Sequence, residues 1–273
     1  KRCAPIQVNY LGYPGTSGTN YLDYIIADKI LIPKESQKYY SEKIAYLPDT
    51  YQANDSTKKI SDKIFTREEL GLPKDGFVFC CFNNNYKITP QVFDVWMRLL
   101  KRVENSVLWI LSENINISKN LKKEATIRGV DFNRIVFAER IKMNEHLARQ
   151  KVADLFIDTF PYTGHTTASD ALWVGLPVLT RIGKSFASRV STSLLNAIGL
   201  SALVTNSEKE YEDFAIELAT NSPKLKEIKN KLKNNKNTKP LFNTQVFARN
   251  IEKAYSLMYE RYLKKLPIKN IEI

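Results

Sequence analysis

Residues suited to binding a phosphate group are gathered at His165, Thr166 and Thr167. They follow a short apolar run, 155–157, that is typical of a buried strand, and Gly164 just before them permits a close backbone approach. From His165 onward, apolar residues recur at helical spacing. A strand that leads through a glycine turn into a helix presents free backbone N–H groups and the positive end of the helix dipole to an anion. The pattern therefore indicates a phosphate site.

The same stretch also fits a plain helix start. Thr167 and Asp170 have the spacing of a capping box, and Thr is an ordinary N-cap residue. Spacing alone does not separate the two interpretations. The chain has 2 histidines, His146 and His165, and the position of one of them at this helix start favours binding.

The elements that must position these residues are expected to alternate from about residue 71 onward. Residues 77–82 are an unbroken apolar run, as in a strand buried on both faces, and the helix from Pro90 carries an apolar stripe. The expected strands are 77–82, 107–111, 135–137, 155–157 and 177–179, and the expected helices are those from Pro90 and at 121–128, 145–152, 165–174 and 187–198. The alternation predicts an α/β fold with a doubly wound, Rossmann-like parallel sheet.

The first 70 residues are too few for a second lobe of that kind. They contain strand candidates at 6–11, 24–27 and 43–46 and a glycine-rich loop at 12–18. The polar, irregular stretch at 52–67 suits a linker.

Ligands of a doubly wound sheet bind at the carboxyl ends of its strands. Loops 83–87, 138–146 and 158–167 are expected at that edge. Together they supply a set of side chains that suits a nucleoside diphosphate: Lys87, His146, His165, Thr166, Thr167 and Asp170.

The net charge of +12 allows nucleic acid, an anionic surface or a phosphorylated ligand as the partner. Much of the excess lies in the run 224–239, where apolar residues recur at helical spacing and lysines fill the other face. A solvated helix explains this run. No aromatic residues alternate with its lysines to stack bases, so we do not expect a nucleic-acid partner.

Composition is that of a globular chain with a large core: 273 residues, 43% hydrophobic and 26% charged. No apolar run approaches the roughly 20 residues that span a bilayer, so no membrane partner is expected. The 3 cysteines, two of them adjacent at Cys80 and Cys81, form neither a disulfide framework nor a zinc pattern. We therefore expect a reducing, cytoplasmic environment.

Several motifs, in order along the chain, resemble the catalytic region of the O-GlcNAc transferase family. They are A-P-I-Q-V-N-Y-L-G-Y-P-G-T-S-G, F-N-N-N-Y-K-I, E-H-L-A-R, D-T-F-P-Y-T-G-H-T-T-A-S-D-A-L-W and F-A-S-R-V. The shorter matches S-E-K-I-A-Y-L-P, Y-E-D-F-A and P-L-F-N-T extend the resemblance over nearly the whole chain.

The resemblance implies a two-lobed GT-B glycosyltransferase whose C-terminal lobe holds the UDP-sugar. Family members transfer N-acetylglucosamine from UDP-GlcNAc to Ser/Thr hydroxyls of proteins with inversion, need no metal, and usually carry upstream tetratricopeptide (TPR) repeats. Residues 1–70 would then be the end of the N-terminal catalytic lobe and a linker, and 71–240 the donor lobe. Residues 241–273 would contain a helix that crosses back to the first lobe, or else packs on its own sheet.

The resemblance also assigns roles to single residues. Lys87 would face the diphosphate and stabilise the departing UDP, which makes it the catalytic residue. His165, Thr166 and Thr167 would lie at the phosphates and Asp170 at the ribose. The remaining donor-binding positions are Ile141, Lys142 and Met143 along the uracil, and Asn84, His146 and Arg149 at the border of the site.

Two positions depart from the family pattern. The family often has Gln where this chain has Asn84, and Lys where it has Met143, which bears on donor affinity and sugar choice. The histidine that animal members place near the reacting centre would lie upstream of Lys1. The chain has no Asp-x-Asp pair of the kind that holds a metal ion in metal-dependent transferases, so we expect a lysine and a helix N-terminus to neutralise the leaving phosphate.

Alternatives remain open on the sequence. A related transferase could use another donor, GDP-fucose or UDP-glucose. A non-catalytic module could hold a nucleotide or an anionic partner through the +12 charge. Because the chain begins at Lys1 within a motif, we expect it to be a fragment, and a poor catalyst without the rest of the first lobe.

Overall fold

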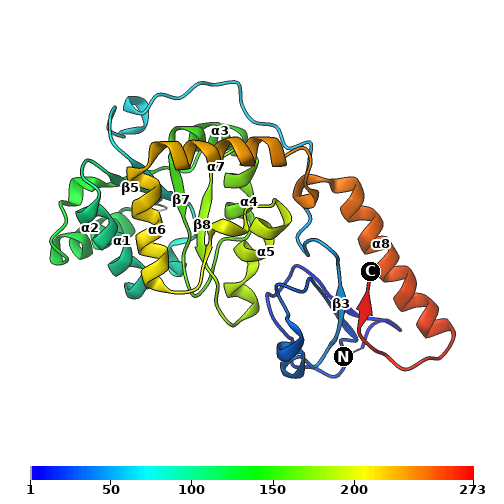
Figure 1. The fold of residues 1–273 in the computed structure, drawn as a ribbon. Coiled ribbons are helices and arrows are strands. Elements are labelled where there is room, and N and C mark those ends of the chain that lie inside the picture. Colours follow the sequence, from blue (N-terminus) through cyan, green and yellow to red (C-terminus); the bar gives the residue numbers. More distant parts are fainter. Residues whose placement is uncertain (1, 113) are drawn as a thin grey trace.

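The computed structural model describes residues 2–112 and 114–273, so Lys1, where the expected first segment begins, lies outside the described residues. Its larger sheet is 6-stranded and parallel, in the order β6-β5-β4-β7-β8-β9 (Figure 1). The strands are β4 (Val78–Cys81), β5 (Val107–Leu111), β6 (Ile135–Ala138), β7 (Leu155–Ile157), β8 (Val178–Arg181) and β9 (Val204–Thr205). The predicted doubly wound α/β fold is confirmed, and β4 and β7 flank the point where the strand order reverses.

A smaller, 4-stranded parallel sheet has the order β1-β2-β3-β10. Its strands are β1 (Val8–Asn9), β2 (Tyr24–Ala27), β3 (Lys43–Tyr46) and β10 (Ile271–Glu272). The last strand comes from the end of the chain and pairs with β3, so the two ends of the sequence build one sheet (Figure 1).

Helices surround the larger sheet on both faces (Figure 1). They are α1 (Pro90–Arg102), α2 (Ile115–Ile127), α3 (Met143–Arg149), α4 (Thr166–Trp173), α5 (Val190–Ala197), α6 (Glu208–Thr220) and α7 (Ser222–Asn235). Short 3-10 turns are η1 (Lys34–Tyr39), η2 (Glu68–Leu70), η3 (Asn85–Lys87), η4 (Phe132–Arg134), η5 (Gln150–Val152), η6 (Phe186–Ser188), η7 (Ser201–Leu203) and η8 (Pro240–Phe242).

Local chemistry explains where several elements begin. The side chain of Thr89 caps α1 by accepting from the Val92 N–H at 3.3 Å, and Pro90 occupies the first turn. The side chain of Asn114 accepts from the N–H groups of Asn116 and Ile117, at 3.0 and 3.1 Å. This cap starts α2 six residues before the predicted helix 121–128, because an Asn N-cap gives no apolar signal.

Other differences from the sequence prediction are small. The expected strand 6–11 pairs over Val8–Asn9 alone, and the helix expected at 145–152 is α3 followed by η5. The strands at 107–111 and 155–157 match. Three elements, β9, α6 and β10, were not predicted, and two of them are strands of two residues.

The helix α8 (Thr244–Leu263) leaves the larger sheet and packs on the smaller one (Figure 1). Its Ala254 and Met258 are buried against Tyr24 and Ile26 of β2 and against Ile271 of β10. These contacts form a hydrophobic core that is separate from that of the larger sheet.

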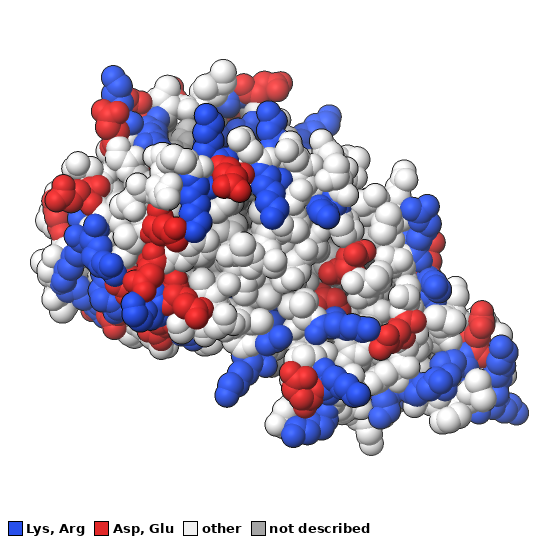
Figure 2. Space-filling view, in the orientation of Figure 1, with Lys and Arg blue, Asp and Glu red and all other residues white. Residues whose placement is uncertain are grey.

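The surface carries both signs of charge. Figure 2 shows basic and acidic side chains interspersed over the face in view. The lysine-rich run expected as a solvated helix lies largely in α7, whose buried residues are Leu225 and Leu232. None of the described helices combines the length and the apolar character that crossing a membrane requires.

The two sheets meet at a buried carboxylate. Asp28, which follows β2, accepts hydrogen bonds from the N–H groups of Leu31 and Tyr51, at 3.0 and 3.1 Å, and from the Ser193 hydroxyl of α5, at 2.6 Å. Nearby, Arg189 Nε donates to the Ile30 carbonyl at 2.5 Å. The contact therefore joins the carboxyl edge of the smaller sheet to α5 of the larger one.

We expect Asp28→Ala to lower the free energy of unfolding by about 3 kcal/mol, because several buried donors lose their acceptor at once. Urea unfolding of the variant and the parent chain measures this. Lys29→Ala is the matched control, because Lys29 is exposed and pairs only with Glu272, and it should change little. Equal stability of the two variants would contradict the role given to Asp28.

Candidate functional site

The predicted loops meet at the carboxyl edge of the larger sheet. The loop after β4 ends in η3, the loop after β7 leads into α4, and the loop after β6 leads into α3. Since β4 and β7 are neighbours whose onward connections run in opposite directions, their loops flank the crevice where ligands of such sheets bind.

Asp158 is a fully buried carboxylate that fixes the turn after β7. One oxygen, Oδ1, accepts from Asn83 Nδ2 at 2.9 Å, from the Thr159 N–H at 2.9 Å and from the Gly164 N–H at 2.6 Å. The other, Oδ2, accepts from the Thr180 hydroxyl at 2.7 Å. Burial raises the pKa of Asp158 above its usual value, against these opposing hydrogen bonds. The sequence analysis missed Asp158 and Asn83, although both directly follow predicted strands.

The glycine turn is held from its other side by α5 and the residues before it. Ser191 donates its hydroxyl to the Gly164 carbonyl at 2.7 Å, and Thr163 bonds the Ala187 carbonyl through its N–H, at 3.1 Å, and its hydroxyl, at 2.8 Å. A Cβ on Gly164 would lie 3.0 Å from the Ala168 side chain and 3.0 Å from Asn83 Oδ1. Glycine is needed here for close packing, as the sequence predicted.

Lys87 lies in η3 with its side chain turned inward, and the residue is 9% exposed. Its Nζ donates to the Thr163 carbonyl at 2.9 Å and lies 3.9 Å from the centre of the Tyr162 ring. Burial lowers the pKa of Lys87, and Asp158 opposes that shift. An ammonium group has three N–H donors, so hydrogens remain for a ligand at this point.

His165 is the N-cap of α4 and lies beside Lys87. Its ring is 5.2 Å from that of Tyr162, and its buried Nε2 has no hydrogen-bond partner among the described residues. Burial, and then the charge of Lys87, lower the pKa of His165 to about 4, so the imidazole is neutral at physiological pH. The neutral ring adds no charge to the site, and its single N–H is shared with the Ala187 carbonyl.

The capping-box alternative is wrong. His165 makes no side-chain cap, and the Thr167 hydroxyl donates to Asn83 Oδ1 instead of bonding the helix backbone. Thr166 is exposed at the first position of the helix. The start of α4 thus keeps backbone N–H groups available for a ligand.

His146 and Arg149, three residues apart on α3, form a second group. Arg149 bonds His146 Nδ1 through Nε at 3.1 Å, and the His146 ring stands edge-on to Phe82 with centroids 4.9 Å apart. Burial and the Arg149 charge lower the pKa of His146 to about 4, and burial lowers the pKa of Arg149 to about 10. Phe82 directly precedes Asn83, so this group borders the same crevice.

The remaining predicted positions are open to solvent. Ile141 is 37% and Met143 55% exposed, and Lys142 between them is exposed too. Asn84 is exposed and caps η3 by accepting from the Tyr86 N–H at 3.4 Å. These side chains lie at the rim of the site.

Asp170 is buried one helical turn into α4 and forms an ion pair with Lys58. Burial raises the pKa of its carboxyl, and Lys58 opposes that shift. The sequence analysis missed Lys58, because it lies 112 positions away in a stretch interpreted as a polar linker.

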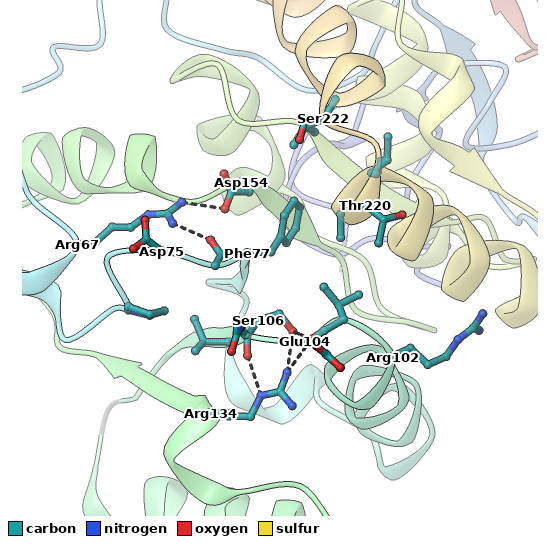
Figure 3. Close-up of a pocket in the computed structure, with 18 of the residues that line it drawn as sticks. Arg67, Asp75, Phe77, Arg102, Glu104, Ser106, Arg134, Asp154, Thr220 and Ser222 are labelled. Carbon is teal, nitrogen blue, oxygen red and sulfur yellow. Dashed lines mark hydrogen bonds and ion pairs between the residues drawn. The ribbon is translucent and has the colours of Figure 1, made fainter.

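A cavity of about 1310 Å³ lies at the opposite, amino edge of the sheet. None of the predicted site residues lines it. As Figure 3 shows, Arg67 pairs with the adjacent Asp154, at 2.8 Å, and Arg134 bonds the Ser106 carbonyl, at 2.8 Å. Arg67 and Arg134 are thus engaged with Asp154 and with backbone carbonyls, so the crevice at the carboxyl edge is the stronger candidate site. Among the described residues, no group of three or more His, Cys, Asp or Glu is placed to hold a metal ion.

Comparison with known proteins agrees with the resemblance of the motifs. The profile of the family described as Glycosyl transferase family 41 matches residues 1–65 and 53–251. A probable UDP-N-acetylglucosamine–peptide N-acetylglucosaminyltransferase SEC of Arabidopsis thaliana is 39% identical over 94% of the chain, which covers 27% of that relative. The UDP-N-acetylglucosamine–peptide N-acetylglucosaminyltransferase of Caenorhabditis elegans is 27% identical over 99% of the chain, which covers 33% of it. The chain thus spans about a quarter to a third of the length of these relatives.

Solved structures show the same architecture. A mutant of the Thermobaculum terrenum O-GlcNAc transferase superposes with a TM-score of 0.85 and 28% identity, covering 96% of this chain and 50% of that one. WaaG, a glycosyltransferase involved in lipopolysaccharide biosynthesis, superposes with a TM-score of 0.61 and 16% identity, covering 87% of this chain and 64% of that one. The fold is therefore that of the C-terminal lobe of a GT-B glycosyltransferase.

We expect both histidines to titrate with a pKa of about 4, well below the value of about 6.5 for a free imidazole. Between these values the unfolded chain binds more protons than the folded chain. Their contribution to stability should therefore be complete above about pH 6.5 and be lost as the pH falls toward about 4.

Imidazole proton shifts followed by NMR against pH measure the two pKa values. His165→Gln and His146→Gln assign the signals and remove one contribution each from the pH dependence of urea unfolding. A ring that titrates near pH 6.5 would contradict the burial described here.

Proposed function

The chain belongs to glycosyl transferase family 41, and from this premise we propose that it is the donor-binding half of a protein O-GlcNAc transferase. The complete enzyme would transfer N-acetylglucosamine from UDP-GlcNAc to Ser/Thr hydroxyls of a protein or peptide acceptor, with inversion and without a metal. The observation that carries the proposal is the buried Lys87 ammonium beside the unpartnered Nε2 of His165, at the start of α4. The printed names of the relatives, UDP-N-acetylglucosamine–peptide N-acetylglucosaminyltransferases, support it.

The chemistry proposed for these residues depends on the negative charge that develops during transfer. When an acceptor hydroxyl displaces UDP, negative charge grows on the leaving phosphate. Lys87 faces that charge from an anchored position, the N–H groups of the first turn of α4 point at it, and the neutral His165 ring lies beside them without adding a second buried charge. These groups neutralise the phosphate without a metal ion. Thr166 and, through its backbone N–H, Thr167 belong to the same phosphate contact, since the Thr167 hydroxyl is engaged with Asn83.

The nucleoside is proposed to lie along the rim. Ile141, Lys142 and Met143 would follow the uracil, with His146, Arg149 and Asn84 at the border of the site. Asp170, one turn into α4, would accept hydrogen bonds from the ribose hydroxyls. The exposure of the rim side chains supports this assignment, since a ligand can reach them.

The full-length protein is proposed to be cytoplasmic and to carry the rest of the N-terminal catalytic lobe and upstream TPR repeats. The short share of the relatives that this chain spans supports additional parts. The buried, adjacent Cys80 and Cys81 are compatible with a reducing compartment.

We expect the full-length protein to transfer N-acetylglucosamine from UDP-GlcNAc to Ser/Thr peptides equally well with and without EDTA. Mass spectrometry of the peptide measures transfer, with GDP-fucose and UDP-glucose as competing donors. Faster transfer from GDP-fucose would overturn the donor assignment, and loss of transfer in EDTA would overturn the metal-free mechanism. Salt-sensitive binding without nucleotide preference would favour an electrostatic binding module instead.

We expect Lys87→Ala in the full-length enzyme to lower kcat by roughly 10²–10³, with a smaller change in KM, because the charge on the phosphate is greatest in the transition state. Steady-state kinetics with a peptide acceptor separate the two constants. Lys119→Ala, on the exposed face of α2, is the control and should leave both unchanged. A raised KM at unchanged kcat would make Lys87 a ground-state binding residue only.

A further inference from the structure

The segment that connects β3 to β4 is hydrogen-bonded to α4. Figure 1 shows it leaving β3 and running over the outside of the larger lobe. Asn54 accepts from the Ser169 hydroxyl of α4, while its Nδ2 donates to the Leu241 carbonyl at 3.1 Å and its own carbonyl accepts from the Thr244 hydroxyl at 2.8 Å. Segment 54–58 is therefore held between α4 and the start of α8.

Lys58 is fixed at two points on α4. Its carbonyl accepts from the Trp173 indole N–H at 3.1 Å, and its ammonium pairs with Asp170 Oδ1. The Asp170 side chain is 7% and the Lys58 side chain 29% exposed. A lysine whose backbone is pinned one helical turn from its partner loses less conformational entropy on pairing than an ordinary surface lysine does.

Lys58 is the charged group that acts on Asp170. The neighbouring cations of the elements packed around α4 are engaged elsewhere: Arg189 with backbone carbonyls, Arg181 with Glu208, and Lys236 over the Trp173 ring. The hydrogen bond from Lys58 occupies Oδ1, and a carboxylate has capacity for further donors at Oδ2.

We propose that Lys58 is a positioning residue of the donor site, which holds the Asp170 carboxylate ionised and oriented toward the ribose hydroxyls of the nucleotide. The proposal rests on the proposed function, since it takes the ribose contact of Asp170 from there. Without its counter-ion, a carboxylate this deeply buried gains a proton more readily and then no longer accepts on both oxygens. A purely structural clamp would instead stabilise the connection and leave nucleotide binding unchanged.

The test is calorimetric titration of the full-length protein with UDP and with 2′,3′-dideoxy-UDP, which lacks the hydroxyls that Asp170 would bind. We expect Lys58→Met to weaken UDP binding on the order of tenfold at about pH 6, because a charge-assisted contact is disturbed. Binding relative to the parent should recover as the pH is raised, because Asp170 then ionises again. The preference for UDP over the dideoxy analogue should shrink in the variant.

Matched variants separate positioning from folding. Lys59→Met removes the adjacent, exposed lysine and should bind both ligands like the parent protein. Lys58→Arg should keep the UDP affinity within about twofold of the parent. In a protein that already carries Asp170→Asn, adding Lys58→Met should weaken UDP binding little further. Should Lys58→Met fail to fold, Lys58→Gln replaces it. The bond from Trp173 to the backbone carbonyl of residue 58 is available in either variant.

The outcomes distinguish the proposed role of Lys58 from the proposed function on which it rests. A parent protein that binds no UDP overturns the proposed function, and the role of Lys58 with it. A parent that binds UDP, with a Lys58→Met variant of equal affinity, equal pH dependence and equal preference for the hydroxyls, overturns the role of Lys58 alone. Additive losses from Lys58→Met and Asp170→Asn would also overturn it, because Lys58 would then act independently of Asp170.

Discussion

The geometry of the crevice depends on the buried carboxylate of Asp158. Its hydrogen bonds tie together the end of β4 through Asn83, the turn before α4 through Gly164, and β8 through Thr180. Removing a carboxylate from water is costly, and only a complete set of donors offsets that cost. The turn can therefore take few other shapes. The Thr163 carbonyl that anchors Lys87 adjoins Gly164, so the position of the ammonium follows from the same network.

The charges in the crevice suit the anion that we propose to bind there. Lys87 donates to a neutral carbonyl and lies over the Tyr162 ring, so no carboxylate of the described residues offsets the cost of burying its charge by a hydrogen bond. A phosphate oxygen placed there would relieve that cost, which makes binding more favourable than at a lysine already paired with an acid. The neutral His165 ring adds no second buried charge beside it.

Sequence reasoning located the elements that have a strong apolar signal. The strands at 107–111 and 155–157 are continuous apolar runs, and α1 has both a cap and a stripe, so these were found. Strands of two residues, such as β9 and β10, are too short to leave a pattern. In the site, the expectation that loops 83–87 and 158–167 meet at the carboxyl edge is confirmed by the bond from Lys87 to the Thr163 carbonyl. The pairing of Lys58 with Asp170 was not readable, because nothing local marks a partner 112 residues away. The bond between His146 and Arg149 was within reach, since side chains three residues apart on a helix are neighbours.

Helix α5 links the turn at Gly164 to the contact between the sheets. Ser191 on this helix bonds the Gly164 carbonyl, and Ser193, two residues on, bonds Asp28 from the smaller sheet. Asp28 follows the carboxyl end of β2, and Gly164 follows the carboxyl end of β7. Because both are bonded to α5, this helix fixes the carboxyl edge of one sheet relative to that of the other. A parallel sheet offers its loops for binding at this edge alone. The fold thus holds the carboxyl edge of the smaller sheet at a fixed distance from Lys87. Lys87 need not contact that sheet directly.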